Sequence, residues 1–562
     1  MGIKVGSSGG HRSTTKKALC EGDFGGYGLR TLLASRTPRR PMSPKAPLPP
    51  RRALDFSRRT IALLFLACFV LVAIPIVTHP IPPLSDYVNH LARMKVIATP
   101  ADPDLSRFYF LEWRVLPNLM MDMVVPLLDR FADIYVAGEI YTLMCFALIG
   151  FGTLYLHRAL FGSWSAIPLV AFPLLYNNIF LIGVMNYIFG IGLCLCGLAT
   201  WVLLRDKPWP WRYAVSCLFV LALFFCHLFA TGVYGVGILS YELMRLSDRR
   251  GGPLRNRLIA FVTAGLPFAL TVPLLLMSPT WGLKGENYWE PRGKIDGLEF
   301  VINVYYDYVA FSLTAVVVLA GAWAVRHKLL RTHAMLLFLL VVSGMVYMAL
   351  PRTVFATYMA DQRLPVAIAF MVIACIQVDL RHRLAQRGFA AVLLLLVAVR
   401  VAEVQIVWND LTQWTVAFHD SIAKIKRGSK VLVAYADPWG GSKSTDLGLV
   451  HAACLAIIER SSLVTTAFTV PGKQILRVHP PYTDWVDTED GTPPSREQLL
   501  VTEEEGTPDG PRYWDLWPQH FDYVYMLFTE PGDPNPDSDR LELVYAGDRF
   551  QLYRVIKPPP AS

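Results

Sequence analysis

The sequence predicts a polytopic α-helical membrane protein of about 11 transmembrane helices, followed by a C-terminal external domain of the α/β (α+β) class. Three observations predict this class. The mean hydropathy is +0.37 over 562 residues. Only 17% of the residues are charged, whereas soluble domains carry about 25%. Lys and Arg also fall in short stretches between apolar segments, as they do in the cytoplasmic loops of membrane proteins.

The same composition argues against several classes of function. The formal charge of +9 is divided among these loops, which argues against nucleic acid as a partner. The sequence has no P-loop, no GxGxxG after a strand, no HExxH and no GxSxG, so the motifs of common soluble enzymes are absent. Cys194 and Cys196 stand two apart, which fits no metal site, and the use of a divalent cation stays open.

Residues 1–59 are predicted to form a disordered cytoplasmic tail. They are basic, rich in Gly, Ser, Pro and Arg, and without apolar periodicity, so they cannot bury enough surface to fold alone. Met42 stands shortly before the first span and offers an alternative start of translation, which leaves open whether residues 1–41 are made.

The first span covers residues 60–79, whose length is enough to cross roughly 30 Å of hydrocarbon. No small-residue cleavage site follows, so we expect it to remain as an anchor. Residues from 80 onwards are then external. Four arginines precede the span and hold the N-terminus on the cytoplasmic side: Arg51, Arg52, Arg58 and Arg59.

Further apolar segments of the chain are long enough to be spans, within errors of a few residues. Placing residues 135–157 as the second span puts every strongly basic short loop on the cytoplasmic side. The N-terminus is then inside and the C-terminus outside. The remaining predicted spans are 165–182, 184–204, 212–229, 231–246, 257–278, 299–325, 331–350, 364–380 and 388–407.

The apolar segment 117–131 is predicted not to cross the membrane. It is short and contains Asp122 and Pro126, and a crossing here would invert every later loop. An interfacial helix on the outer leaflet fits this segment better.

Three external pieces follow from this topology: a loop at 80–134, a loop at 279–298 and a domain at 408–562. The domain has β-branched apolar runs, a helical stretch at 446–459 and a mobile Pro-rich loop at 470–515. It contains a single cysteine, Cys454, so no disulfide can form within it. The predicted strands are 430–435, 521–528, 541–547 and 550–555, the last two joined by a hairpin turn at 546–548.

The first external loop carries the most suggestive group of polar residues. Asp86, His90 and Arg93 stand four and three apart, so a helix after Pro83 would present them on one face near the membrane surface. Such a group could deprotonate an acceptor or position a phosphate. Alternatively, Asp86 caps the helix and Arg93 pairs with it or with lipid headgroups.

This organisation resembles the GT-C superfamily of polyprenyl-phosphate-dependent glycosyltransferases, such as protein mannosyltransferases and lipid A aminoarabinose transferases. The resemblance rests on the anchor, on Asp86 directly after it, on the helix that opens at Pro117, and on LHRALFGSWSA at 156–166. It covers most of residues 60–410. The acidic pair common in that superfamily is missing, because Tyr87 follows Asp86 and the next acids are Asp102, Asp104 and Glu112.

The resemblance implies transfer of a sugar from a polyprenyl-phosphate donor to a glycan, lipid or protein acceptor on the outer face of a bacterial inner membrane. Asp86 would be the catalytic base, and outer-face cations would stabilise the leaving phosphate. Arg363 ranks first among the cations, although it could instead snorkel or pair with Asp361. The other predicted substrate-binding residues are His90, Arg93, Glu112, Arg114, Asn177, Asn186, Lys284 and Arg292.

Several of these residues also have a purely structural interpretation. Asn177 and Asn186 could bind sugar hydroxyls, but could equally cap helices and form the turn around Gly183. A non-catalytic transporter or flippase, or an assembly protein for lipid-linked glycans, is the alternative function. The discriminating observation is whether Asp86, Arg93 and Arg363 converge on one cavity.

Overall fold

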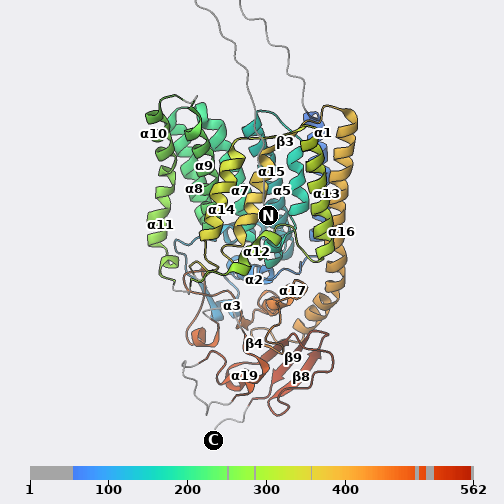
Figure 1. Ribbon diagram of the computed structural model, residues 1–562. Helices are drawn as coiled ribbons and strands as arrows, with labels where there is room; N and C mark the ends of the chain where they lie inside the picture. The colour runs from blue at the N-terminus through green and yellow to red at the C-terminus, as the bar shows by residue number, and fades with distance from the viewer. Residues whose placement is uncertain are drawn as a thin grey trace, which may run out of the picture. The chain divides into compact units, whose positions relative to one another are not determined.

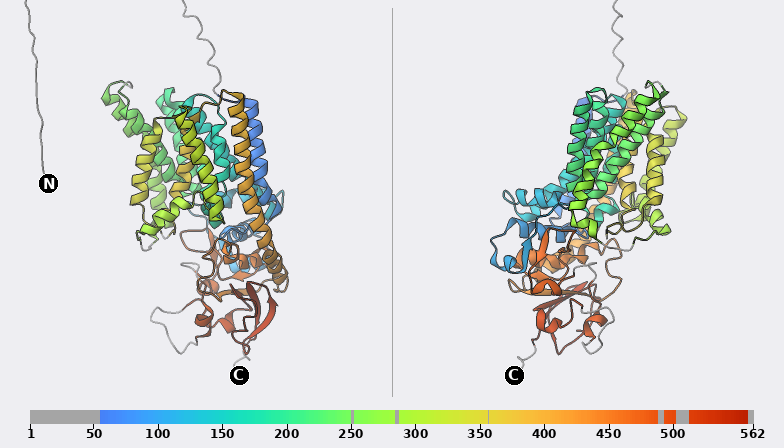
Figure 2. Two further views of the ribbon diagram at one scale, coloured as in Figure 1. Left: turned by 45° about the vertical axis from the view of Figure 1, so that its right-hand side comes forward. Right: turned by 90° about the vertical axis from the view of Figure 1, so that its left-hand side faces the viewer.

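The computed structural model describes residues 55–249, 252–283, 287–355, 357–487, 493–501 and 512–557. These residues belong to one compact unit, Ala53–Ser562. Long helices form a bundle, and a mixed sheet with short helices lies beyond one end of it (Figures 1 and 2). The predicted tail at 1–59 and the alternative start at Met42 lie almost wholly outside the described residues.

Within the described part of the chain, 7 helical segments are long and apolar enough to cross a membrane. Helix α9 (Leu228–Ser247) packs against several of these segments but is not one of the 7. Two further apolar helices are shorter: α14 (Met335–Ala349) and α15 (Arg363–Ala374). The 7 segments are α1 (Arg58–Thr78), α5 (Ile134–Phe161), α7 (Met185–Leu203) with η2 (Leu204–Asp206), α8 (Trp209–Cys226), α10 (Leu254–Ala264) through η4 (Leu266–Leu270) to α11 (Thr271–Met277), α13 (Asp307–Arg326) and α16 (Arg383–Ile422).

One predicted span is not a single helix. Residues 165–182 form the 3-10 helix η1 (Ile167–Leu174) and the short helix α6 (Asn178–Ile182). Pro168 and Pro173 lack the backbone N–H that an α-helix needs, and so a continuous helix does not form here. The count of about 11 transmembrane helices stays a prediction, because 7 segments of the described residues meet the length and hydropathy of a span.

The segment predicted to stay at the surface is too short to cross a bilayer. Helix α4 (Met120–Leu128) has 9 residues, whereas about 20 are needed. It packs against α2 (Tyr87–Ala98), α5, α7 and α8. The prediction that residues 117–131 do not span is in agreement with this length.

The C-terminal sheet has the strand order β5-β4-β7-β9-β8. Strand β4 runs parallel to β5 and β7, whereas β9 is antiparallel to β7 and β8. All four predicted strands are present, and β8 and β9 form the predicted hairpin. The strands are β4 (Lys430–Tyr435), β5 (Leu463–Val464), β7 (Tyr523–Leu527), β8 (Leu541–Ala546) and β9 (Phe550–Val555).

The helical stretch predicted at 446–459 is present in three short pieces, and further short elements complete the outer part. The segment 470–515 is not simply a loop, because it contains a strand and two helical turns, while residues 488–492 and 502–511 lie outside the described residues. The short elements are α17 (Leu447–Val450), η6 (Ala452–Cys454), α18 (Leu455–Arg460), β6 (Leu476–Val478), η7 (Tyr482–Trp485), α19 (Arg496–Leu500) and α20 (Trp517–His520).

The first external loop and the C-terminal residues share one hydrophobic core. Strand β1 (Tyr109–Leu111) pairs antiparallel with β6, and α3 (Pro103–Phe108) precedes it. Arg427 forms ion pairs with Asp102 and Asp104. Helix α16 runs without a break from the bundle into this core, through the boundary expected near residue 408. Helix α2 is thereby held between the bundle and the C-terminal sheet.

Candidate active site

A polar pocket of about 490 Å³ lies where the start of α2, the start of α15 and the C-terminal residues meet. We call it the Asp86 pocket. It brings together residues that are far apart in the sequence, among them Asp86 and Arg363, which were predicted to act together. The charged and imidazole side chains that line it include Asp86, His90, His227, Arg363 and His451.

Asp86 is held at the pocket by its backbone. Its N–H donates to the carbonyl of Ile182 at 2.9 Å, and the N–H of Ser85 donates to Leu181 at 3.0 Å. Gly183 makes this close approach possible, because it has φ +86° and a Cβ at this position would lie 2.9 Å from the Asp86 nitrogen. The backbone of the broken segment therefore fixes where α2 begins.

The Asp86 carboxylate is suited to take up a proton near neutral pH. It does not cap α2, contrary to the structural alternative for this residue, and 27% of the side chain remains exposed. Burial raises its pKa to about 7, although the charges of Arg363 and Arg93 and a hydrogen bond with Ser85 oppose the rise. A carboxylate with this pKa can act as a general base at physiological pH.

Arg363 faces the pocket from the first position of α15. Its Nη1 lies 3.2 Å from Nε2 of His227, and its Nη2 donates to the carbonyl of Tyr358 at 3.1 Å. The side chain is 8% exposed, so it does not snorkel. Its Nε has no hydrogen-bond partner. The guanidinium therefore keeps donor capacity for an anion inside the pocket.

One alternative was a pair between Arg363 and Asp361, but Asp361 has other partners. It accepts a hydrogen bond from Nζ of Lys294 at 2.7 Å, and Nη1 of Arg352 lies 4.0 Å from its other oxygen. Lys294 belongs to α12 (Pro291–Glu299), and its carbonyl accepts from the Tyr347 hydroxyl at 2.6 Å. This buried charge cluster braces the segment that leads into Arg363.

His90 and Arg93 do not act on the same space, which corrects the prediction of a shared face. His90 lines the pocket and packs edge-on against the ring of Phe468. Burial and the nearby Arg93 and His451 lower the pKa of His90 well below its usual value, so the ring stays neutral. Arg93 instead turns to α4 and forms a two-pronged pair with Asp122, with N–O distances of 2.8 and 3.0 Å.

Three other predicted substrate-binding residues do not line the pocket. Glu112 and Arg114 pair with each other on the surface beyond β1. Arg292 is exposed on α12. None of these three belongs to the pocket lining among the residues that the structure describes. Lys284 lies outside the described residues.

The two predicted asparagines have structural partners. Asn177 caps α6 by accepting from the N–H of Phe180, so the capping alternative holds for it. Asn186 donates to the carbonyl of Asn118 at 2.9 Å and accepts from the N–H of Met121 at 2.7 Å. Because Asn118 lines the Asp86 pocket, Asn186 shapes the pocket from behind.

The sequence did not identify the C-terminal side of the pocket. Nε2 of His451 lies 3.7 Å from Oδ1 of Asp86. No motif marks His451, and its pocket neighbours on α2 lie far away along the chain. Only its polar character within the predicted helical stretch 446–459 gave a signal. The other C-terminal residues that line the pocket include Thr466, Phe468, Val470, Lys473, Gln474 and Asp487.

No group of three or more His, Cys, Asp or Glu side chains that could hold a metal ion is found in the part of the chain that the structure describes. The polar side chains that the pocket offers to a substrate include a carboxylate, a guanidinium and several imidazoles.

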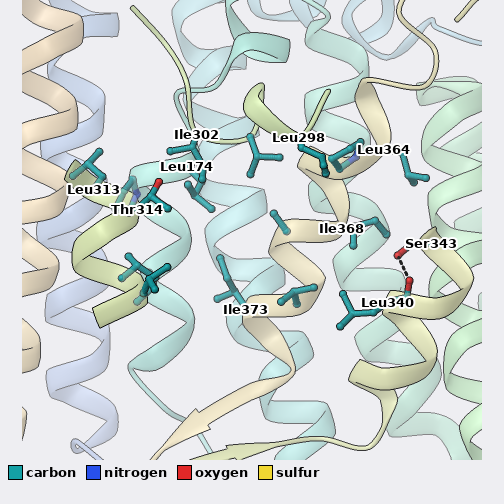
Figure 3. A pocket seen from close by; sticks show the side chains of 18 of the residues that line it. Leu174, Leu298, Ile302, Leu313, Thr314, Leu340, Ser343, Leu364, Ile368 and Ile373 are labelled. Atoms are coloured by element: carbon teal, nitrogen blue, oxygen red, sulfur yellow. Dashed lines mark hydrogen bonds between the residues drawn. The ribbon is translucent and has the colours of Figure 1, made fainter. Parts of the chain in front are cut away.

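An apolar groove of about 510 Å³ is lined by Leu364, and the preceding residue, Arg363, lines the Asp86 pocket. We call it the Leu364 groove, since Leu364 directly follows Arg363 on α15. Figure 3 shows Leu313 of α13, Leu340 of α14 and Ile368 of α15 lining the same space. Such a groove between bundle helices offers a place for a hydrocarbon chain.

Comparisons with known proteins give one structural match of note. No family model matches the chain, and no curated protein matches it at a significant level. The crystal structure of ArnT from Cupriavidus metallidurans bound to undecaprenyl phosphate is similar, with 10% sequence identity, coverage of 90% of this chain and 100% of that chain, and a TM-score of 0.49. A likeness of this degree fixes neither fold nor activity, which rest on the geometry of the present chain.

Proposed function

We propose that this chain is an integral membrane glycosyltransferase that moves a sugar from a polyprenyl-phosphate donor to a glycan, lipid or protein acceptor. The observation that carries the proposal is the convergence of Asp86 and Arg363 on one pocket, with Leu364, the residue after Arg363, lining an apolar groove. Convergence of Asp86, Arg93 and Arg363 is also the observation expected to distinguish an enzyme from an assembly or receptor protein. Arg93 does not take part in it.

The donor phosphate is assigned to Arg363. A guanidinium whose Nε has no partner can donate to phosphate oxygens and stabilise the charge that develops as the phosphate leaves. The polyprenyl chain would continue along the Leu364 groove, because Leu364 follows Arg363 directly on the same helix. One ligand would thus occupy a cation and an apolar surface that lie side by side.

The acceptor is assigned to the side of Asp86. The sugar phosphate already has a good leaving group, so the protein must place an acceptor hydroxyl in line and take its proton. Asp86 is the carboxylate of the pocket whose pKa allows this near pH 7. The C-terminal residues from Thr466 to Gln474 would form the wall against which the acceptor lies.

The pocket is assigned to the outer face of a bacterial inner membrane. Helices α1 and α16 both begin with arginines, Arg58 and Arg383, at the bundle end remote from the C-terminal sheet (Figure 1). Basic residues favour the cytoplasmic side, which places the opposite end, with the pocket, outside. The C-terminal sheet would then lie in the periplasm.

A transfer assay tests the proposed function. Membranes containing the wild-type protein are supplied with a panel of radiolabelled polyprenyl-phosphate sugars, alongside Asp86→Asn at matched expression. We expect transfer by the wild type and a loss of about 100-fold or more in Asp86→Asn. Asp539→Asn, which changes an exposed acid of the same outer part, is the matched control and should behave as the wild type.

The outcomes separate the alternatives. Transfer that is equal in Asp86→Asn and the wild type would refute the assignment of the base. An absence of transfer with every donor, together with binding or translocation of a lipid-linked glycan, would instead support a transporter or an assembly protein.

A further inference from the structure

His451 is the C-terminal side chain that comes nearest to Asp86. It directly follows α17, is 5% exposed, and its ring packs edge-on against Phe468 with centroids 4.9 Å apart. The same Phe468 ring also packs against His90, with centroids 5.4 Å apart. The imidazole is thus fixed between the C-terminal residues and α2, with Nε2 directed at Asp86.

Asn89 determines which imidazole nitrogen carries the proton. Its Nδ2 donates to the carbonyl of Thr466 at 2.8 Å, and its Oδ1 accepts from the N–H of Phe468 at 2.9 Å. These two bonds fix the orientation of the amide, so it is Nδ2 that faces Nδ1 of His451 at 3.2 Å. A nitrogen that faces a donor must accept. Nδ1 is therefore unprotonated.

The neutral ring then has its one proton on Nε2. Burial lowers the pKa of His451 to about 4, which keeps the ring uncharged at physiological pH. A neutral imidazole carries a single N–H. With Nδ1 acting as an acceptor, that N–H lies on Nε2 and faces the carboxylate of Asp86.

We propose that His451 is a positioning residue for Asp86, which donates its Nε2–H to Oδ1 of the carboxylate and leaves Oδ2 for the acceptor hydroxyl. The 3.7 Å separation is longer than a hydrogen bond, and a small rotation of the part-exposed Asp86 side chain closes it. This inference rests on the proposed function, with Asp86 as the base. It makes the C-terminal domain part of the catalytic unit.

The donated hydrogen bond favours the charged carboxylate and so lowers the pH at which Asp86 becomes a base. Among the described residues, the other charged or titratable groups of the pocket lining are His90, His227, Tyr358, Arg363, Lys473 and Asp487, and Arg93 lies behind α2. His90 and His451 remain neutral near pH 7, so the group expected to titrate there is Asp86.

The first test is the pH profile of kcat/KM for transfer in two variants of His451. His451→Phe removes the donor, and we expect the acid limb to move to higher pH. His451→Gln keeps an N–H near the position of Nε2, and its acid limb should stay near that of the wild type. A uniform loss at every pH in both variants, or an unmoved limb in His451→Phe, would overturn the proposal.

The second test needs no activity, so it separates this proposal from the proposed function. Nitrogen NMR of ¹⁵N-histidine-labelled protein in nanodiscs identifies His451 by the signal lost in His451→Gln. We expect the Nε2–H tautomer, with a shift that titrates near pH 7 in the wild type and not in Asp86→Asn. An Nδ1–H tautomer, or a shift indifferent to Asp86→Asn, would refute the pairing even if transfer is observed.

Discussion

The Asp86 carboxylate is partly desolvated in its pocket. The charged form is needed for activity but lowers the stability of the fold. The base must be deprotonated to act, so kcat/KM should rise as the pH rises through about 7. The folded-state pKa exceeds the ordinary value of 3.8. The stability that the group contributes is therefore complete below the unfolded pKa and is lost as the pH rises through the folded pKa.

Asp86→Asn should accordingly stabilise the protein while it abolishes transfer. The gain relative to the wild type should be larger at pH 8 than at pH 5, and is about 1–3 kcal/mol after allowance for the exposed part of the side chain. Thermal unfolding in detergent at the two pH values measures it. An Asn variant that is less stable than the wild type at pH 8 would contradict the unfavourable burial of the carboxylate.

Arg363 should tolerate no exchange for lysine. The guanidinium contacts His227 and the Tyr358 carbonyl with two different nitrogens, which one ammonium group cannot reproduce. We expect Arg363→Lys to lower kcat/KM for the donor by about 10–100-fold. Arg326→Lys, which changes an exposed arginine at the end of α13, serves as the control. Wild-type kinetics in Arg363→Lys would refute the assignment of the donor phosphate to Arg363.

At this scale the sequence could identify residues only where local spacing places them. Asp86 and His90 lie on one helical turn, and Arg363 begins an apolar helix, so their positions near the membrane surface followed from the pattern. The spacing also predicts Arg93 on this face. In the structure Arg93 instead pairs with Asp122 on another helix, and no local pattern signals that pairing. His451 reaches the pocket through the fold of the C-terminal domain, which no spacing reveals.

Among the elements, α2 and α4 are joined by the Arg93–Asp122 pair. Both side chains are 1% exposed, so removing one partner leaves the other charge buried and unpaired. We expect Arg93→Gln or Asp122→Asn to destabilise the protein by about 3–5 kcal/mol, and the double variant Arg93→Met/Asp122→Leu to recover most of this loss. Thermal unfolding measures both. A loss of transfer without a change in unfolding temperature would instead mean that Arg93 contacts the substrate.

The elements themselves were largely predictable, with exceptions that have physical causes. Apolar runs of helical length and β-branched runs in the C-terminal domain gave the long helices and four strands at nearly the right residues. Residues 165–182 are equally apolar, but their prolines prevent one helix. Strands β1 and β6 are 3 residues each and exist through pairing with each other, which a local pattern cannot contain.

For the whole molecule, the proposed topology predicts opposite accessibility of the two ends. A cysteine at an exposed site of the C-terminal domain, Asp539→Cys, should react with a membrane-impermeant maleimide in cells with a permeabilised outer membrane. Arg326→Cys, at the other end of the bundle, should react only after the inner membrane is opened. The parent protein, which retains its natural cysteines, gives the background. The reverse pattern would invert the topology and place the pocket in the cytoplasm.

Helix α16 links the outer part of the molecule to the bilayer. With 40 residues it is about 60 Å long, so it acts as a lever whose far end moves about 1 Å for each degree of tilt. Its outer end carries part of the core on which His451 rests, whereas Asp86 is tied to the bundle through Ile182. A thinner or thicker membrane changes the tilt that its helices adopt. A change of tilt would therefore reach the hydrophobic core that α2 and the C-terminal residues share.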